Sequence, residues 1–304
     1  MTNEPPARAV SADHILVSAT DDAFAAAAAV ALLSAAVHCR QRPPCLIIDC
    51  GISTPTRAWL HDTFALRAVP LTCRAVDGAR FSDLPLSAHL TAATYARLAA
   101  AELAGDLAAR SLYLDADTLT VAAVDPLLDA DLGGHAAGAV QDPKVRFVSR
   151  PGGVTGWRRL GIPAATAHFN AGVLLIDNAA WRAEGVSERA LELLRSAPEE
   201  ATFADQGALN GALAGRWMPL AERWNVAVPR SAGVSVAGRV ISRHAVVALG
   251  DLGILHFSGL VKPWQPDYAP SPYRRRYSRA LATYAPAAEQ PRYDSVWRWA
   301  RTRR

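Results

Sequence analysis

Buried apolar runs alternate with helical segments along the first half of the chain, and this alternation constrains the fold most. His14 to Ala19 reads as a buried strand, residues 23–39 as an alanine-rich helix, and Cys45 to Asp49 as a second buried strand. Strands that are apolar on both faces and separated by helices are typical of a parallel sheet covered by helices. We therefore predict an α/β fold of nucleotide-binding type with a mainly parallel central sheet.

The same alternation continues through most of the chain. It predicts helices over residues 54–65, 91–107, 187–196 and 205–214, and strands over residues 68–74, 111–114, 136–140, 171–176 and 253–257. Residues 143–163 are rich in Pro, Gly and Arg and lack periodicity, so we expect a functional loop or lid there. Residues 225–247 are also irregular.

Length and composition indicate one large domain with terminal extensions. With 304 residues, 51% of them hydrophobic and 20% charged, the chain can bury a substantial core. We predict a flexible N-terminus over residues 1–12, a main domain over residues 13–270 and a basic aromatic extension over residues 271–304.

Charge is unevenly distributed along the chain. The net charge is only +4, which does not favour a nucleic-acid partner. The C-terminal extension nevertheless contains nine arginines against Glu289 and Asp294. Two interpretations remain open: peripheral contact with anionic lipid headgroups, or a solvated end.

The cysteines and the apolar runs suggest a cytoplasmic protein. Cys39, Cys45, Cys50 and Cys73 show no CxxC spacing, so we expect free, mostly buried thiols in a reducing compartment. The apolar residues 23–37 are too few to span a bilayer and follow two aspartates rather than basic residues. We therefore expect a cytoplasmic location, with the inner membrane face as a peripheral site.

Asp115-Ala116-Asp117 is the sharpest local feature. Carboxylates at positions i and i+2 after a strand lie on one side, at the edge where open α/β sheets bind ligands. Two such carboxylates repel each other unless a cation lies between them, which indicates a divalent metal site. A solvated turn without metal remains an alternative. A phosphatase nucleophile is disfavoured because Leu119 stands where that motif has Thr or Val.

His256, Gly259 and Lys262 form the second feature. An imidazole, an uncovered backbone and a point cation suit a diphosphate bridged to a metal. Lys262 is one of only two lysines among 32 basic residues, so its presence here indicates a chemical preference for lysine.

Five segments together resemble a known family. They are Thr94 to Leu98, Leu112 to Asp117, Phe169 to Ile176, Asp205 to Asn210 and His256 to Trp264. In this order they resemble glycosyltransferase family 8, in particular its bacterial lipopolysaccharide α-galactosyl- and glucosyltransferases, with glycogenin as a more distant member. The resemblance extends over residues 14–267, which is most of the chain.

The resemblance implies a GT-A fold and a retaining transfer of galactose or glucose from a UDP-sugar to a saccharide or glycolipid acceptor. It implies that Asp115, Asp117 and His256 bind Mn²⁺, for which Mg²⁺ could substitute. Uridine would lie beside Ala19 and Asp21, and the diphosphate beside Gly259 and Lys262. Acceptor sites in such enzymes are built from loops, and the candidates here are His89 and the segments 143–163 and 225–247. The other implied donor-binding positions are Arg97, Ala116, Asp142, Asn170 and Ala171, with Asp115 itself included. One departure, Ala23-Phe24 in place of Asn followed by an aromatic residue, removes a polar contact to the nucleotide.

The implied catalytic residues are Gln206 and Asp205. Gln206 matches the far face of the sugar and is a poor nucleophile, so we favour front-face attack, with Asp205 as nucleophile the alternative. Ordinary roles also remain: Arg97 as a salt-bridge partner on a helix face, Asn170 in a turn and Asp205 as a helix N-cap. The competing function is a non-catalytic UDP-sugar-binding scaffold of the same fold. The oligomeric state is not indicated.

Overall fold

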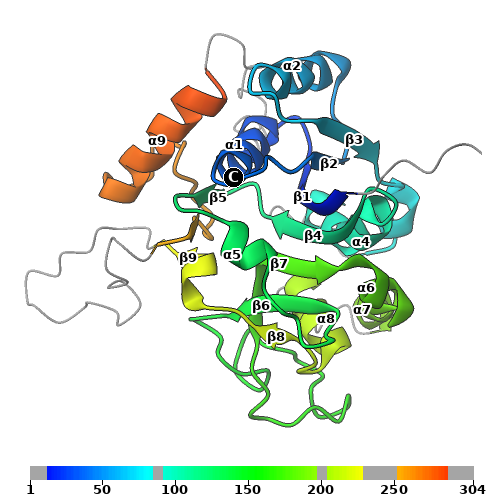
Figure 1. Ribbon diagram of the computed structural model, residues 1–304. Coiled ribbons are helices and arrows are strands. Elements are labelled where there is room, and N and C mark those ends of the chain that lie inside the picture. Colours follow the sequence, from blue (N-terminus) through cyan, green and yellow to red (C-terminus); the bar gives the residue numbers. More distant parts are fainter. Residues whose placement is uncertain (1–11, 85–91, 197–203, 229–251, 287–304) are drawn as a thin grey trace, which may run out of the picture.

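Two β-sheets organise the part of the chain that the computed structural model describes, which comprises residues 12–84, 92–196, 204–228 and 252–286 (Figure 1). A seven-stranded sheet has the order β3-β2-β1-β4-β7-β6-β8, and a three-stranded sheet has the order β5-β10-β9. His89 and most of the 225–247 segment lie outside the described residues, so the expected acceptor loops are seen only in part.

Four parallel strands form one half of the large sheet: β1 (Ala12–Thr20), β2 (Cys45–Asp49), β3 (Leu71–Ala75) and β4 (Ala108–Leu114). The described connections are α1 (Ala25–Val37), α2 (Thr54–Ala65), η1 (Gly78–Phe81), α3 (Ala92–Ala96), η2 (Arg97–Ala99) and α4 (Ala100–Ala104). The helix that we expected over residues 91–107 is therefore interrupted by a 3-10 turn at Arg97.

The other half of the large sheet contains β7 (Phe169–Asp177), β6 (Ala137–Gln141) and β8 (Met218–Pro219). The small sheet contains β5 (Thr118–Thr120), β9 (Val226–Ala227) and β10 (Ile254–His256). The remaining helices are α5 (Asp125–Leu128), α6 (Asn178–Ala183), α7 (Val186–Ser196), α8 (Ala204–Leu213), η4 (Glu222–Asn225) and α9 (Pro272–Tyr284).

The predicted α/β class with a mainly parallel sheet is confirmed, with one difference in β7. This strand runs antiparallel to both of its neighbours, β4 and β6. An apolar strand buried on both faces has the same composition in either direction, so the sequence does not reveal its polarity.

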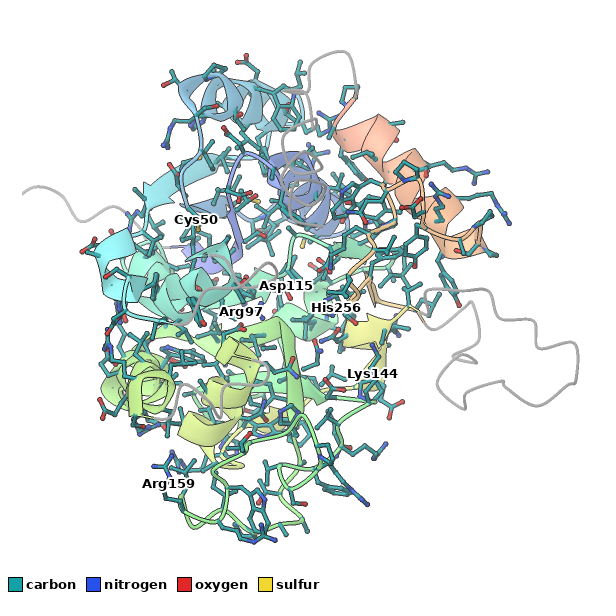
Figure 2. All side chains as sticks on the ribbon, turned by 180° about the vertical axis from the view of Figure 1, so that it is seen from behind. Cys50, Arg97, Asp115, Lys144, Arg159 and His256 are labelled. Atoms are coloured by element: carbon teal, nitrogen blue, oxygen red, sulfur yellow. The ribbon has the colours of Figure 1, made fainter. Side chains whose placement is uncertain are left out.

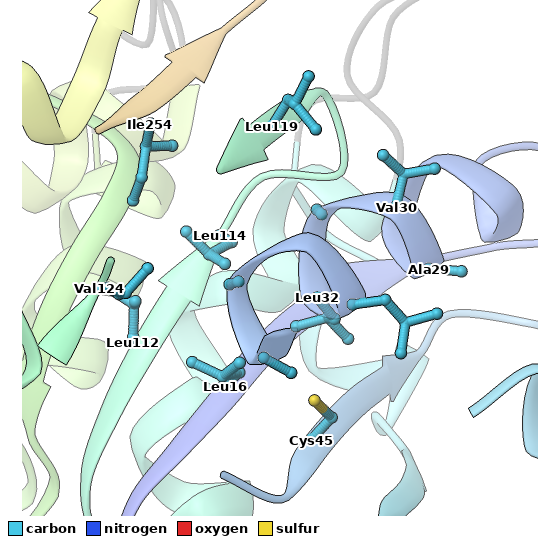
Figure 3. Close-up of a cluster of buried hydrophobic side chains, with 14 of the residues drawn as sticks. Leu16, Ala29, Val30, Leu32, Cys45, Leu112, Leu114, Leu119, Val124 and Ile254 are labelled. Atoms are coloured by element: carbon cyan, nitrogen blue, oxygen red, sulfur yellow. The ribbon is translucent and has the colours of Figure 1, made fainter. Parts of the chain in front are cut away.

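Helices cover both faces of the large sheet because alternate strand residues point to opposite sides. Leu16, Leu112 and Leu114 pack against α1 and the small sheet (Figure 3). Val17 and Tyr113, their neighbours in the strands, belong to the cluster on the other face with α4, α6, α7 and α8. Helix α1 is buried almost throughout, as its alanine-rich sequence predicts.

The start of the basic extension is part of the folded body. Ser271 caps α9 by accepting a hydrogen bond from the Arg274 backbone amide, and Pro272 occupies the first turn. Tyr277 is fully buried, and its ring contacts the rings of Phe257 and Trp264. Helix α9 therefore packs on α1 with its apolar side (Figure 1).

The four cysteines are free thiols, with Cys39 and Cys45 buried, as expected. Burial raises the pKa of Cys39 to about 12, so this thiol is unreactive at neutral pH. Among the helices of the described ranges, none combines the length and hydrophobicity that a bilayer crossing requires.

Candidate active site

The register between two short strands brings the acidic pair and the histidine together. Asp115 and Asp117 lie in the turn that follows β4, and β5 then pairs antiparallel with β10, with Thr118 opposite His256. Asp115, Asp117 and His256 each offer a ligand atom, and these atoms lie within 4.8 Å of one another. The His256 Nε2 atom is 3.2 Å from Asp117 Oδ1 and 3.7 Å from Asp115 Oδ2. Figure 2 shows Asp115 and His256 next to each other, with Arg97 nearby.

Lys262 pairs with the same aspartate. Its Nζ donates to Asp117 Oδ2 at 2.5 Å. Burial would raise the pKa of Asp117, but the positive charge of Lys262 and the hydrogen bond that it donates lower it below its usual range. Asp117 is therefore ionised at neutral pH and available to a cation.

Arg97 links Asp115 to a further carboxylate, that of Asp205. Its Nη2 lies 3.0 Å from Asp115 Oδ1, its Nε lies 2.5 Å from Asp205 Oδ2, and its Nη1 donates to the Ala171 carbonyl at 2.7 Å. Only 11% of the Arg97 side chain is exposed, so Arg97 is a buried cation that bridges the two carboxylates. Tyr113, which the sequence analysis missed, lies under the guanidinium and donates to Asp115 Oδ1 at 3.2 Å.

Asp205 lies in the first turn of α8. Helix α8 begins at Ala204, and the Asp205 carboxylate is buried against Arg97. Burial raises the pKa of Asp205 to about 6, because it outweighs the opposing charge of Arg97. A carboxylate held in this way is poorly placed to leave its partner and attack a sugar.

Amide side chains connect β7 to β6 and α8. Gln206 Oε1 accepts from the Ala171 amide at 3.2 Å, and Gln206 Nε2 donates to Asp142 Oδ2 at 3.2 Å. Asn170 Nδ2 donates to the same Asp142 oxygen at 3.3 Å, and Asp142 Oδ1 accepts from the Lys144 amide at 2.8 Å. These three polar side chains thus form one cluster next to the acidic pair.

The remaining expected positions lie outside this contact network in the described part of the chain. Ala19 is buried near the end of β1, and Ala116 is half-buried between the two aspartates. Asp21 Oδ1 accepts from the backbone amides of Ala23 and Phe24 and thereby holds the turn before α1. Gly259 follows β10 and donates from its amide to the Phe257 carbonyl.

Asn225 is the second functional candidate that the sequence analysis missed. Its Oδ1 lies 2.9 Å from His256 Nδ1, and its Nδ2 donates to Asn170 Oδ1 at 2.9 Å. The residue ends η4 and is buried. In the sequence, Asn225 is a single Asn after Trp224 and belongs to no recognisable motif. Its position beside His256 is therefore seen only in the structure.

The donor atoms fit a divalent cation. Two carboxylates and an imidazole form a mixed oxygen and nitrogen set, which suits Mn²⁺ better than Mg²⁺. Gly172 faces this group of atoms from β7, and a Cβ at this position would overlap the His256 ring and the Asp115 carboxylate. The glycine therefore leaves the space that the three ligands require.

A mixed α/β sheet with an Asp-x-Asp pair and a histidine at its ligand-binding edge defines a GT-A glycosyltransferase. The profile of glycosyl transferase family 8 matches residues 15–267, and the chain belongs to this family. The sequence-based family and fold predictions are thereby confirmed.

Individual proteins are also similar to this chain. General stress protein A of Bacillus subtilis is 27% identical over 235 residues, which cover 76% of this chain and 79% of the relative. The lipopolysaccharide glucosyltransferase WaaO of Escherichia coli is 30% identical over 202 residues, 64% of this chain and 55% of the relative. The match thus spans about half of WaaO.

A solved structure agrees with both. The galactosyltransferase LgtC, crystallised with donor and acceptor sugar analogues, superposes with a TM-score of 0.73 at 27% identity. The match covers 88% of this chain and 95% of LgtC. The fold similarity therefore includes nearly the whole of that enzyme.

Proposed function

We propose that this protein transfers a hexose, galactose or glucose, from a UDP-sugar to a saccharide or glycoconjugate acceptor, with retention at the anomeric carbon and with Mn²⁺. The observation that carries the proposal is the convergence of Asp115, Asp117 and His256 within 4.8 Å at the ligand-binding edge of the sheet. The names of the relatives, a lipopolysaccharide glucosyltransferase and a galactosyltransferase, support the hexose donor. They also support lipopolysaccharide biosynthesis as the setting.

Asp115, Asp117 and His256 would hold the metal, which when bound supplies Lewis-acid stabilisation of the leaving diphosphate. Lys262 supplies a second positive charge at the same place, because its Nζ already lies 2.5 Å from Asp117. With the backbone around Gly259, Lys262 would hold the diphosphate, and the end of β1 from Ala19 to Asp21 would bind uridine.

The hexose would bind beside the amide cluster. Asp142 accepts hydrogen bonds there from both Asn170 and Gln206. Arg97 holds Asp115 by an ion pair and the Ala171 carbonyl by a hydrogen bond. Ala116 and Ala171 present backbone without bulky side chains next to the acidic pair. These positions can orient a sugar without offering it a nucleophile.

The transfer step is front-face. The bond from C1 to the diphosphate oxygen breaks, the acceptor oxygen bonds to C1 on the same face, and the acceptor proton passes to the departing diphosphate. Support comes from the two candidate nucleophiles: Gln206 is an uncharged amide hydrogen-bonded to Ala171 and Asp142, and Asp205 is buried against Arg97. Neither group is free to form a covalent intermediate.

The most direct test of the reaction is a screen of UDP-sugars for Mn²⁺-dependent release of UDP. We expect UDP-galactose or UDP-glucose to be turned over in the presence of Mn²⁺ and to be stable after chelation with EDTA. Binding of UDP-sugars with neither transfer nor hydrolysis would instead identify a non-catalytic scaffold protein.

We also propose peripheral contact of the basic extension with the inner face of the cytoplasmic membrane. Arg275, Arg276 and Arg279 are exposed on α9, whose opposite side packs on the body of the protein. Exposed arginines bind anionic headgroups electrostatically.

The full chain is expected to sediment with vesicles that contain phosphatidylglycerol, and less so at high salt. Substitution of these three arginines with glutamine should weaken sedimentation, whereas substitution of Arg158 and Arg159 in the 143–163 loop should not. The proposal would be contradicted if the two variants bound anionic vesicles equally well, or if they bound neutral vesicles as well as anionic ones.

A further inference from the structure

The ring nitrogen of His256 that carries the proton can be inferred from a chain of hydrogen bonds that begins at a backbone amide. One backbone amide near the metal ligands, that of Gly172 on β7, donates to Asn170 Oδ1 at 3.0 Å. A backbone N–H can only donate, so the Asn170 atom that faces it must be the carbonyl oxygen. This contact settles which end of the Asn170 carboxamide is which, a choice that amide side chains usually leave ambiguous.

The orientation of Asn170 determines that of Asn225. The Asn225 atom that lies 2.9 Å from Asn170 Oδ1 faces an oxygen that can only accept, so it must be the NH₂ group. The same NH₂ group lies 3.4 Å from the Asn170 backbone carbonyl, which is a second acceptor. The other end of the Asn225 carboxamide, its oxygen, therefore faces His256.

The orientation of Asn225 in turn determines the histidine tautomer. Asn225 Oδ1 lies 2.9 Å from His256 Nδ1, so Nδ1 must carry a proton in order to donate. The remaining nitrogen, Nε2, faces Asp115 and Asp117 at 3.7 and 3.2 Å. In the neutral imidazole Nε2 carries the lone pair, which is the atom that a metal ion requires.

We propose that Asn225 is a positioning residue that holds His256 in the Nδ1–H tautomer, with Nε2 directed at the metal site. The Gly172 backbone amide fixes the orientation of Asn170, and Asn170 in turn fixes that of Asn225. This inference rests on the proposed function only in naming the metal as the ligand. Partners of a histidine ligand commonly fix its tautomer and ring orientation, and their loss typically weakens metal binding about 10–100-fold.

The same hydrogen bonds continue to the sugar side of the site. Asn170 donates to Asp142 Oδ2 at 3.3 Å, and Gln206 donates to that same oxygen at 3.2 Å. The metal-binding imidazole and the amides beside the hexose position thus belong to one chain of hydrogen bonds. A change at Asn225 is therefore expected to affect both metal and donor-sugar binding, through different ends of its carboxamide.

Two variants of Asn225 and one control variant, all in the full chain, separate these roles. Metal binding is measured with Mn²⁺ alone by electron paramagnetic resonance, and donor binding is measured with UDP-hexose and UDP. Asn225→Leu keeps the volume but removes acceptor and donor, so Mn²⁺ affinity should fall about 10–100-fold. Asn225→Asp keeps an acceptor for Nδ1–H, so it should retain most of the Mn²⁺ affinity. Because it places an oxygen against Asn170 Oδ1, it should weaken binding of UDP-hexose more than that of UDP.

Asn178→Leu is the matched control. Asn178 is equally buried, accepts from Ser111 Oγ and donates to the Ala108 carbonyl, away from the metal ligands. It should lower thermal stability without changing Mn²⁺ affinity. Wild-type Mn²⁺ affinity in Asn225→Leu, or an equal loss in Asn225→Leu and Asn225→Asp, would overturn the proposal.

A second measurement does not depend on metal binding. In metal-free protein with ¹⁵N-labelled histidine, the His256 ring is expected to show a protonated, slowly exchanging Nδ1 at a pH where its own ¹⁵N shifts report a neutral ring. A neutral ring with its proton on Nε2 would overturn the inference. If the wild-type protein binds no Mn²⁺, the proposed function fails, and this spectrum alone decides the tautomer.

Discussion

Asp117→Ala is expected to abolish metal-dependent UDP release, lowering turnover by about a thousandfold or more, whereas Gln206→Ala slows it by about a hundredfold or less. Asp117 is the only residue of the described part that contacts both His256 Nε2 and Lys262 Nζ, so its loss removes a metal ligand and frees the lysine. Gln206 only orients the site through Ala171 and Asp142. Both rates are measured at saturating Mn²⁺ and UDP-hexose.

The comparison of these two variants tests the front-face mechanism. Asp129→Ala is the control, because it removes an exposed carboxylate whose ion pair with Arg40 lies on the surface, and turnover should not change. Equal inactivation of Asp117→Ala and Gln206→Ala, with both proteins folded by circular dichroism, would contradict front-face attack. It would indicate that Gln206 takes a direct chemical part in the step.

Arg97→Gln is expected to lower the free energy of unfolding by about 3–5 kcal/mol, because it leaves two carboxylates without their shared counter-ion. Asp115 and Asp205 both lie within 3.0 Å of the guanidinium, and Asp205 is buried. The measurement is urea unfolding at pH 8 and pH 5. The control Arg74→Gln removes an ion pair with the exposed Asp106 and should cost at most about 1 kcal/mol.

The pH dependence of this loss follows from Asp205. Its pKa in the folded protein is raised to about 6, above the usual value of 3.8, so the ionised form is disfavoured in the folded state. Asp205 therefore costs stability as the pH rises through this range, and removal of Arg97 increases that cost. The deficit of Arg97→Gln relative to wild type should be larger at pH 8 than at pH 5. A deficit that is independent of pH would contradict the role assigned to the Arg97–Asp205 pair.

Much of the fold could be predicted because its elements are local in sequence. The order of strands and helices follows from apolar runs and helical periodicity, and the Asp-x-Asp turn lies at the end of β4 as expected. The direction of β7 relative to β4 and β6 was not predictable. A strand that is buried on both faces is apolar throughout, so its sequence lacks the alternation of apolar and polar residues that is typical of many antiparallel strands. The packing of Tyr277 under Trp264 likewise joins segments without any shared motif.

The candidate site could be predicted where single residue types carry the chemistry. Asp115, Asp117, His256 and Lys262 stand out by type and spacing, and the structure brings them together. Asn225 could not be identified, because a neutral amide acts only through its hydrogen bonds, and these depend on the pairing of distant strands. The role of Arg97 as a buried bridge was also hidden, since a helix interrupted at that residue reads as continuous in sequence.

The central claim is that Asp115, Asp117 and His256 jointly bind one cation next to a nucleoside diphosphate. Crystals grown with Mn²⁺ and UDP, measured at the manganese absorption edge, test it most directly. We expect one anomalous peak in contact with an oxygen of each aspartate, with His256 Nε2 and with the diphosphate, while Lys262 has moved from Asp117 towards a phosphate. An anomalous peak elsewhere, or UDP bound away from these three side chains, would contradict the assignment of this site.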